Sequence, residues 1–375
     1  MRRPAVALVA ALALCAFAGQ ARAAAPTADA NAWEVMNAAN GEVLASYDAH
    51  RQLPMASLTK LMTVIVAMKH LQPGETVAVS PKAARAGGSR IPLRPGQKIT
   101  VDDLLKGALI QSANDAADAL ADAAAGGDRD LFVSWMNEEA QRLGLRDSHF
   151  VRPDGLDAPG HVSSAHDLGV LAQVAMHSPL FRSIVKRRTD TIENGHVAVH
   201  TWNDLLGVFP GLIGVKTGHT DKAGWCEVAA ARRQGYTIYA VILGSPSRTQ
   251  RNADLRRLLS WGVAQYRTLT LVAAKPYAYA ETGYGRPALA LAATKPLVRV
   301  IPAGSHVVMR ITAPSAVKLP VEQGQRLGTI EIRVDGQLYW ERPLVAARSV
   351  ERPGLGGRLR WYATRTVHDF VGLFS

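Results

Sequence analysis

A serine and a lysine three residues apart open a long apolar segment, and their types and spacing suggest nucleophilic chemistry. Ser57 and Lys60 begin a run to His70 that has apolar side chains on nearly every face and is followed by a Gln-Pro-Gly break at 72–74. This pattern predicts a buried helix. The i,i+3 spacing places hydroxyl and amine on one face, so Lys60 is a candidate base for a nucleophilic Ser57. The alternative is a capping serine and a surface lysine, because S-x-x-K is a common pattern.

Two later motifs supply the other residue types that such a site needs. Ser112 and Asn114 fall between two predicted helices, where both side chains can point into one cleft. Lys216, Thr217 and Gly218 fall on a predicted strand. In this order the motifs resemble the S-x-x-K, S-D-N and K-T-G set of class A β-lactamases and penicillin-binding proteins, with alanine at the middle position of the second motif.

The elements that must position these motifs follow from periodicity and turn residues. Strands are predicted at 33–36, 42–47, 215–220, 225–231 and 236–243. Helices are predicted at 57–70, 100–109, 115–125, 130–143, 164–178 and 250–266, the second with a capping-box start and the fourth with a glycine after its end. Strands, helices, three strands and a helix predict an α/β sandwich with an antiparallel sheet and a helical subdomain.

Composition divides the chain into four parts. Residues 1–23 combine a positive start, an apolar stretch and an Ala-Arg-Ala cleavage site, which predicts a signal peptide and an exported protein. Residues 24–268 are the expected catalytic domain. Residues 269–352 are rich in Val, Pro, Gly and Thr in short alternating runs, which predicts a small all-β domain. Residues 353–375 are the expected linker and tail.

The tail has the pattern of a helix that lies on a membrane surface. Val367, Phe370, Val371 and Phe374 recur at helical spacing, and aromatic and arginine residues lie just upstream. The pattern predicts a peripheral anchor on the inner-membrane surface. The alternatives are a frayed end or an apolar strip that docks on the β domain.

Net charge and cysteine content bear on the surroundings of the protein and on whether it has a disulfide. The net charge is +12, and removal of residues 1–23 takes away three arginines and leaves +9. Such a chain suits lipid headgroups or an acidic cell-wall polymer, although simple solubility explains the charge as well. Cys226 is the only cysteine after the signal peptide, so we expect it in the core and not in an internal disulfide. His196 and His200 are four residues apart but have no glutamate in the position of a zinc-protease motif, so we expect no metal site there. We also expect no cofactor and no nucleic-acid partner.

Longer stretches around the motifs resemble the low-molecular-mass D-alanyl-D-alanine carboxypeptidases. The similar stretches are 54–63, 111–117 and 216–225, with asparagine at 37 and Trp-Cys at 225–226 as small departures. The resemblance runs from about residue 33 to residue 262. It implies the penicillin-binding protein and serine β-lactamase fold, followed by a β domain and an amphipathic tail in that family's usual order.

Residue types suggest the roles of the first two motifs. Hydrolysis of an amide needs a nucleophile, a proton acceptor, a proton donor and an oxyanion site. Ser57 is the expected nucleophile, and Lys60 is its base if burial and the like charge of Lys216 lower the lysine's pKa. Ser112 can relay a proton between Lys60, Lys216 and the leaving nitrogen, and Asn114 can hold the substrate's backbone amide.

The resemblance implies the remaining roles. The oxyanion donors are the backbone N–H groups of Ser57 and His219. Thr217, with Lys216 behind it, receives the free carboxylate of the substrate, and Gly218 leaves room for the substrate to lie along the strand. Arg251 stands where the family has a carboxylate-binding arginine, although a helix-surface arginine is the plain alternative.

The resemblance implies a serine-type carboxypeptidase that removes the terminal D-alanine from peptidoglycan stem pentapeptides and binds β-lactams as inhibitors. Together with the predicted signal peptide, it implies a periplasmic protein. A class A β-lactamase is excluded, because residues 115–215 hold glutamates only at 138, 139 and 193, none in a Glu-x-x-Leu-Asn context. An endopeptidase that cuts cross-links and a non-catalytic cell-wall scaffold remain the alternatives.

Overall fold

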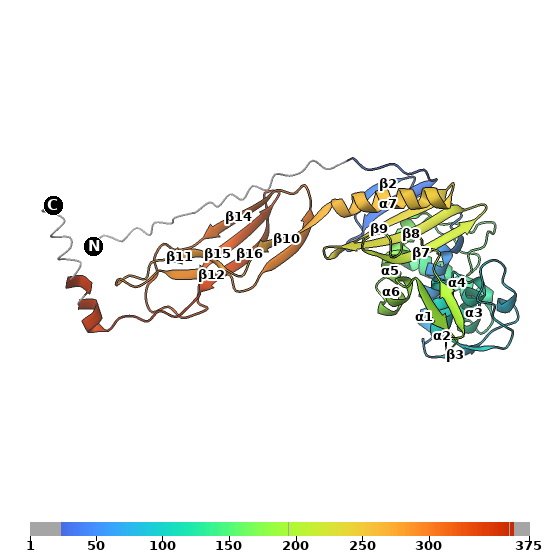
Figure 1. The fold of residues 1–375 in the computed structure, drawn as a ribbon, viewed down its shortest axis with the longest axis horizontal. Helices are drawn as coiled ribbons and strands as arrows, with labels where there is room; N and C mark the ends of the chain where they lie inside the picture. The colour runs from blue at the N-terminus through green and yellow to red at the C-terminus, as the bar shows by residue number, and fades with distance from the viewer. Residues whose placement is uncertain (1–23, 194, 360, 364–375) are drawn as a thin grey trace. The chain divides into compact units, whose positions relative to one another are not determined.

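The computed structural model describes residues 24–193, 195–359 and 361–363, and the chain divides into two compact units at residue 265/266 (Figure 1). The expected signal peptide and the apolar tail residues Val367, Phe370, Val371 and Phe374 lie outside the described residues. The boundary falls three residues before the one expected from composition. The reason is that α7, Arg248–Ala264, ends early and a strand of the second unit begins at Tyr266.

The first unit is built on a five-stranded antiparallel sheet in the order β2-β1-β9-β8-β7. The strands are β1 Ala32–Asn37, β2 Val43–Tyr47, β7 Leu212–Thr220, β8 Gly224–Arg233 and β9 Tyr236–Ser245. Helix α7 contacts β1, β8 and β9 from one face, and the remaining helices lie on the other (Figure 1). The predicted sandwich is thereby confirmed, and it leaves β7, which carries the K-T-G motif, at the edge of the sheet.

The helical part surrounds one central helix. It consists of α1 Lys60–His70, α2 Val101–Leu109, α3 Asn114–Ala124, α4 Arg129–Leu143, α5 Ala165–Ala175 and α6 Pro179–Val185. Helix α1 contacts α2, α3, α4 and α5, and most of its side chains are buried. Because the helix is apolar on nearly every face, it can be covered on all sides, which places its first residue, Lys60, inside the protein.

Local signals explain most of the helix ends. Thr100 caps α2 by accepting a hydrogen bond from the Asp103 N–H at 3.2 Å, and Gly144 ends α4 with a φ of 74°. Helix α6 was missed by the sequence analysis. It begins with Pro179 at its first position after the capping Ser178, which is a recognised start signal.

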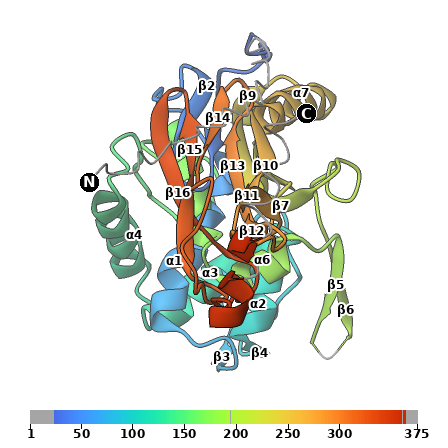
Figure 2. The same cartoon turned by 90° about the vertical axis from the view of Figure 1, so that its left-hand side faces the viewer.

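Two short antiparallel pairs flank the helices. They are β3 Thr76–Ala78 with β4 Lys98–Thr100, and β5 Thr189–Ile192 with β6 Val197–His200. Figure 2 shows the β5–β6 hairpin beside the helices. Among the described residues no single helix is long and apolar enough to cross a membrane; α5 and α6, bent by 112°, meet that length and composition only when taken together.

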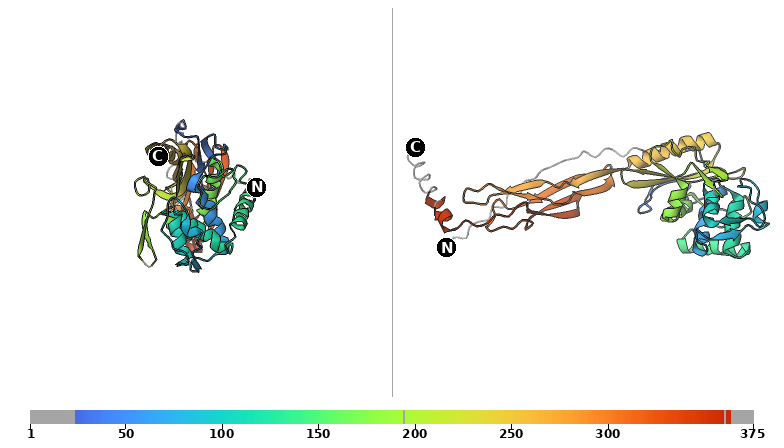
Figure 3. Two further views of the ribbon diagram at one scale, coloured as in Figure 1. Left: turned by 90° about the vertical axis from the view of Figure 1, so that its right-hand side faces the viewer. Right: turned by 60° about the horizontal axis from the view of Figure 1, so that its bottom comes forward.

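The second unit is all β, as predicted. Its strands are β10 Tyr266–Val272, β11 Pro276–Ala280, β12 Leu289–Ala292, β13 Leu297–Pro302, β14 Val307–Thr312, β15 Arg326–Val334 and β16 Gln337–Ala346. They form a sheet in the order β11-β12-β16-β15-β14 and the pair β10-β13 (Figures 1 and 3). Asp335 and Gly336 join β15 to β16 with φ values of 50° and 81°, the backbone that a two-residue hairpin turn requires.

A short helical stretch follows the second unit's last strand. Residues 355–359 and 361–363 are helical. The ring of Trp361 lies 5.3 Å from that of Tyr284, centroid to centroid, and the ring of Tyr362 also faces Tyr284. These two aromatic residues therefore pack against Tyr284 of the β unit.

Candidate active site

A cavity of about 270 Å³ lies in the first unit and collects the three motifs. Seven of the nine predicted site residues line it: Ser57, Ser112, Asn114, Thr217, Gly218, His219 and Arg251. Lys60 and Lys216 are not among the lining residues, and both are almost fully buried, at 0% and 2% exposure. The structure therefore brings together residues that are up to about two hundred positions apart in sequence, with the two amines buried and the two serines at the cavity.

Ser57 lies in a 3-10 turn, Ala56–Thr59, which runs into α1. The sequence analysis places it on the α-helix itself. A 3-10 turn has three residues per turn, so it sets positions i and i+3 directly above one another. The Lys60 Nζ accordingly lies 3.0 Å from the Ser57 Oγ. The predicted pairing of nucleophile and amine is present, and the tighter turn accounts for its alignment.

Lys60 donates to three uncharged oxygens. They are the Ser57 Oγ, the Asn114 Oδ1 at 2.6 Å and the Asp154 main-chain oxygen at 2.5 Å. Burial lowers the pKa of Lys60 to about 8, and nearby carboxylates, Asp154 first and then Asp118, oppose that shift. Burial is therefore the main cause, as expected, but the charges with the next largest effects are acids and not Lys216.

Ser112 and Lys216 form the second amine–hydroxyl pair of the cavity. The Lys216 Nζ donates to the Ser112 Oγ at 2.7 Å and to the Thr217 main-chain oxygen at 2.8 Å. Burial, followed by the charge of Lys60, lowers the pKa of Lys216 well below its usual value. Within the described part of the chain Ser112 is hydrogen-bonded to Lys216 and not to Lys60, so the expected relay is connected at one end only. Ser112 has a φ of 61°, a left-handed backbone that aims its side chain at the cavity.

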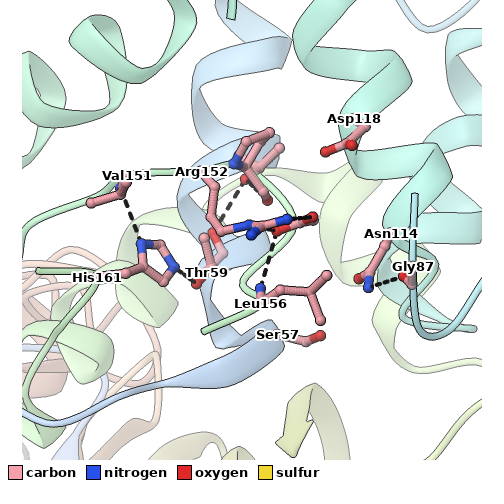
Figure 4. A network of polar contacts seen from close by, with 12 residues as sticks. Ser57, Thr59, Gly87, Asn114, Asp118, Val151, Arg152, Leu156 and His161 are labelled. Carbon is pink, nitrogen blue, oxygen red and sulfur yellow. Dashed lines mark hydrogen bonds and ion pairs between the residues drawn. The ribbon is translucent and has the colours of Figure 1, made fainter. Parts of the chain in front are cut away.

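Asn114 is the first residue of α3 and not a loop residue. Its Oδ1 accepts from Lys60 and its Nδ2 donates to the Gly87 main-chain oxygen at 2.7 Å (Figure 4). The amide therefore connects the lysine to the loop around Gly87. Each Nδ2 carries two hydrogens, so one donor is left for the expected contact with a substrate amide.

Gly218 allows the edge strand to approach the nucleophile. A Cβ at this position would lie 3.0 Å from the Met55 main-chain oxygen and 3.1 Å from the Ser57 backbone nitrogen. From the sequence, this glycine was expected to leave room for a substrate. The structure gives a direct reason within the protein, which is close packing of β7 against the turn that carries Ser57.

His161 supports the turn of Ser57 and was missed by the sequence analysis. The Val151 N–H donates to its Nδ1 at 3.0 Å, so its Nε2 carries the proton and donates to the Thr59 Oγ1 at 2.9 Å (Figure 4). Thr59 in turn donates to the main-chain oxygen of Ala56, which has a φ of 49°. Burial lowers the pKa of His161 to about 4, which keeps the ring neutral. The only sequence signal is its place after two glycines, Gly155 and Gly160, in a loop.

The Lys60 side of the cavity also holds acidic residues that the sequence analysis did not select. Asp118 lies on α3 one turn after Asn114 (Figure 4). It pairs with Arg129 at 2.8 Å. Burial and the charge of Asp154 raise the pKa of Asp118 to about 7. The Asp154 carboxylate is held by Arg152 at 2.5 and 2.7 Å. These charges surround a lysine whose own contacts are neutral.

Arg251 is buried at 1% exposure, so the plain alternative of a helix-surface arginine is wrong. Its Nε lies 3.1 Å from the Oε2 of Glu227, and its Nη2 donates to the Asn252 Oδ1 at 2.7 Å and lies 3.4 Å from the Asp204 Oδ2. Its guanidinium lies over the ring of Trp225, 5.7 Å from the centroid. The ring of Trp225 in turn lies against that of His219, with the centroids 4.1 Å apart and the planes tilted by 33°.

A second arginine, Arg248, lines the same part of the cavity. Its side chain is 39% exposed, pairs with both oxygens of Asp204 and lies over the ring of Trp202 at 5.8 Å. The structure thus places two guanidiniums at the cavity, where one was expected from the sequence.

Within the described residues no group of three or more His, Cys, Asp or Glu side chains is placed to hold a metal ion. Cys226 is fully buried, as predicted, and burial raises its pKa to about 12.

Comparison with known proteins agrees with this geometry. Residues 19–247 match the family described as D-alanyl-D-alanine carboxypeptidase, and residues 266–352 match that described as the C-terminal domain of penicillin-binding protein 5. The chain is 33% identical over 380 residues to D-alanyl-D-alanine carboxypeptidase DacC of Escherichia coli (strain K12), and the alignment covers 95% of this chain and 93% of that protein.

Two solved structures extend the likeness to the fold. Penicillin-binding protein 6B of Escherichia coli has a TM-score of 0.64 and 31% identity, with 86% of this chain and 97% of that chain covered. Penicillin-binding protein D2 of Listeria monocytogenes, in an ampicillin-bound form, has a TM-score of 0.58 and 32% identity, with 64% and 100% covered. Because the carboxypeptidase match spans more than half of the chain, the chain belongs to the D-alanyl-D-alanine carboxypeptidases, a family of serine-type hydrolases.

Proposed function

We propose that this protein removes the terminal D-alanine from peptidoglycan stem pentapeptides through an acyl-enzyme on Ser57, and that it thereby limits cross-linking. The observation that carries the proposal is the 3.0 Å contact between the Ser57 Oγ and a fully buried Lys60. With a pKa of about 8 this lysine is neutral in part of the molecules near neutral pH, and a neutral amine can accept the serine proton.

Acylation follows from the two amine–hydroxyl pairs. The Ser57 Oγ attacks the carbonyl carbon between the two D-alanines, and its proton passes to Lys60. The backbone N–H groups of Ser57 and His219 are the donors for the developing oxyanion. The C–N bond then breaks, and the leaving amine takes a proton from Ser112, which is replenished from Lys216 across their 2.7 Å contact. D-Alanine leaves, and an ester to Ser57 remains.

Deacylation reverses the proton movements with water as the nucleophile. Lys60 first loses to solvent the proton that it took from Ser57, and Lys216 regains one, so that the protonation of the site is restored. Lys60 then accepts a proton from water as the water attacks the ester carbonyl, and it returns this proton to the Ser57 Oγ as the ester bond breaks. The products are the shortened peptide and the free serine. Asn114 stays hydrogen-bonded to Lys60 throughout, which keeps the amine directed at Ser57.

Substrate selection rests on the free carboxylate of the terminal D-alanine. Thr217, Arg248 and Arg251 line the end of the cavity where this group would lie, and Lys216 adds a charge from behind. A β-lactam offers a carboxylate and a strained amide in a similar arrangement, and the Listeria monocytogenes relative was solved with ampicillin bound. β-Lactams should therefore acylate Ser57.

Intact mass after penicillin treatment tests the nucleophile. Wild type should gain the mass of the antibiotic, and Ser57→Ala should not. The assignment fails if both proteins gain the adduct or if neither does. Release of D-alanine from a pentapeptide, measured beside cleavage of a cross-linked dimer, separates a carboxypeptidase from an endopeptidase.

The proposed setting is the periplasm, with peripheral attachment to the cytoplasmic membrane through the tail. The pattern of residues 367–374 and the signal-like residues 1–23 support it. Truncation after Arg352 should leave D-alanine release intact in solution and move the protein from the membrane fraction to the soluble fraction. Unchanged partition would rule out the anchor.

A further inference from the structure

Glu227 is a buried acid beside the cavity to which the proposed mechanism gives no role. It lies in the middle of β8 among apolar residues, is 0% exposed, and stands opposite Thr217 of β7 in the sheet register. Its Oε2 is 3.1 Å from the Arg251 Nε. Nevertheless, neither carboxylate oxygen accepts a well-aligned hydrogen bond from any described residue. A buried carboxylate that is paired but not hydrogen-bonded is costly to keep ionised.

The charges that face Glu227 come from three elements. Helix α7 presents Arg251 and Arg248, the turn after Trp202 presents Asp204, and β7 presents Lys216. On the other side β9 places Ile242 opposite it. Burial raises the pKa of Glu227 to about 7, and the nearby cations, Arg251 first, oppose that shift. The proton of this acid is therefore easily exchanged near neutral pH.

Arg251 is already engaged before any substrate arrives. Its polar contacts use Nε and Nη2, and its Nη1 makes no hydrogen bond to a described residue although the side chain lines the cavity. A carboxylate that reaches Nη1 would share one guanidinium with Glu227. Two like charges on one guanidinium in a buried site repel each other, and the acid with the raised affinity for a proton can relieve that repulsion by taking one up.

We propose that Glu227 is a positioning residue for substrate binding, which takes up one proton from solvent as the terminal carboxylate of the substrate binds Arg251. This rests on the proposed function. The carboxylate of Glu227 becomes a carboxylic acid, the substrate carboxylate replaces it as the counter-ion of Arg251, and the net charge of the site is unchanged. Glu227 in this way holds the guanidinium in place while the cavity is empty and releases it to the substrate.

The direction of the pH dependence follows from this exchange. Below about pH 7 Glu227 is already protonated, so binding needs no further proton and KM is flat. At higher pH each binding event consumes a proton, so KM of the wild type should rise by up to about tenfold per pH unit. An ordinary structural ion pair predicts no such rise from Glu227.

The closing experiment compares kcat and KM for D-alanine release in wild type and Glu227→Gln from about pH 6 to about pH 9. We expect KM of the variant to rise less steeply, so that at the highest pH it falls several-fold below the wild-type KM. Loss of Glu227 also removes an acid that raises the pKa of Lys216, which acts in the opposite direction. A lower KM in the variant therefore cannot come from Lys216. A KM that is higher in the variant at every pH, or parallel profiles, would overturn the proposal.

Glu34→Gln is the matched control, because Glu34 is an equally buried acid of the same sheet that pairs with His166 and does not line the cavity. In this variant KM should rise with pH as steeply as it does in the wild type. Absence of D-alanine release by folded wild type would instead refute the proposed function.

A second measurement does not depend on whether Glu227→Gln folds. Ser57→Ala binds pentapeptide without turnover, and calorimetry in two buffers of different ionisation enthalpy counts the protons taken up. At about pH 8 we expect proton uptake with the pentapeptide and none with the same peptide ending in an amide. Equal uptake with both peptides, or none with either, would overturn the role of Glu227.

Discussion

Lys60 on one side of the cavity and Arg251 on the other are both buried cationic side chains, but their surroundings differ. Lys60 donates only to uncharged oxygens, and carboxylates such as Asp118 act on it from a distance. Arg251 is in direct contact with Glu227 and is close to Asp204. A lysine can meet the cost of burial by losing its proton, whereas a guanidinium cannot. The protein therefore surrounds the first with neutral acceptors and the second with acids.

The two environments suit two different chemical roles. A base must be neutral for part of the time, so a strong counter-ion in direct contact would work against it. A carboxylate receptor must stay charged, so its counter-ions have to be displaced or neutralised by the ligand. Replacing the lysine by arginine, and the arginine by lysine, therefore tests these two roles most directly.

Lys60→Arg should cause the largest loss. It keeps a positive charge beside Ser57 but places a group that does not deprotonate there, so the rate of acylation by penicillin should fall about 10²- to 10⁴-fold. Stopped-flow or mass-resolved acylation rates measure this. Lys60→Gln, which removes charge and base together, is the control and should fall by a similar factor. If the arginine variant keeps most of the activity, the positive charge and not the neutral amine is what matters.

His161 is another buried basic side chain, and burial lowers its pKa as it lowers that of Lys60. Its pKa is about 4 in the folded protein and its ordinary value is 6.5. Unfolded chains therefore bind more protons between these values, and the contribution of His161 to stability is complete above about pH 6.5 and is lost as the pH falls towards 4. The wild type should lose about 2–3 kcal/mol of unfolding free energy from this group between about pH 7 and pH 4.5.

Denaturant unfolding at the two pH values, in wild type and His161→Gln, isolates that loss. Glutamine has a donor and an acceptor for Thr59 and Val151 but does not titrate. The variant should be less sensitive to acid than the wild type by that amount. Equal sensitivity would mean that other groups carry the acid instability.

Arg251→Lys places an amine where the wild type has the guanidinium of Arg251. A buried lysine can lose its proton and cannot present a guanidinium fork, so kcat/KM for the pentapeptide should fall by about tenfold, mainly through KM. Steady-state kinetics measure the split, and Arg257→Lys, an exposed arginine of the same helix, is the matched control. An effect on kcat alone would contradict a binding role.

Asp118→Asn should give the smallest change, a shift in pH dependence. Ionised Asp118 raises the pKa of Lys60, so its removal lowers that pKa below about 8 and moves the acidic limb of the acylation profile to lower pH, by about 0.5–1 unit. Asp122→Asn is the control, because Asp122 shares Arg129 with Asp118 but is not among the main influences on Lys60. A shift of the same size in both variants would show a structural cause.

Most of the fold followed from local pattern. The five strands of the main sheet, the capped start of α2, the glycine end of α4 and the Asp335-Gly336 turn were predicted, because each depends on residues close in sequence. The short pairs β3–β4 and β5–β6 were not predicted. Helix α6 and the early end of α7 were missed, because short helices and helix ends depend on packing as well as on propensity.

The residues of the candidate site could be identified before the fold was known, since S-x-x-K, S-x-N and K-T-G carry their chemistry in residue type and spacing. The contacts of those residues depend on the three-dimensional fold. It set Asp118 near Lys60, placed His161 under the Ser57 turn, and buried Glu227 against Arg251. The physical reason is that charge and burial act through space, so an acid far away in sequence can decide the protonation of a lysine or the availability of an arginine.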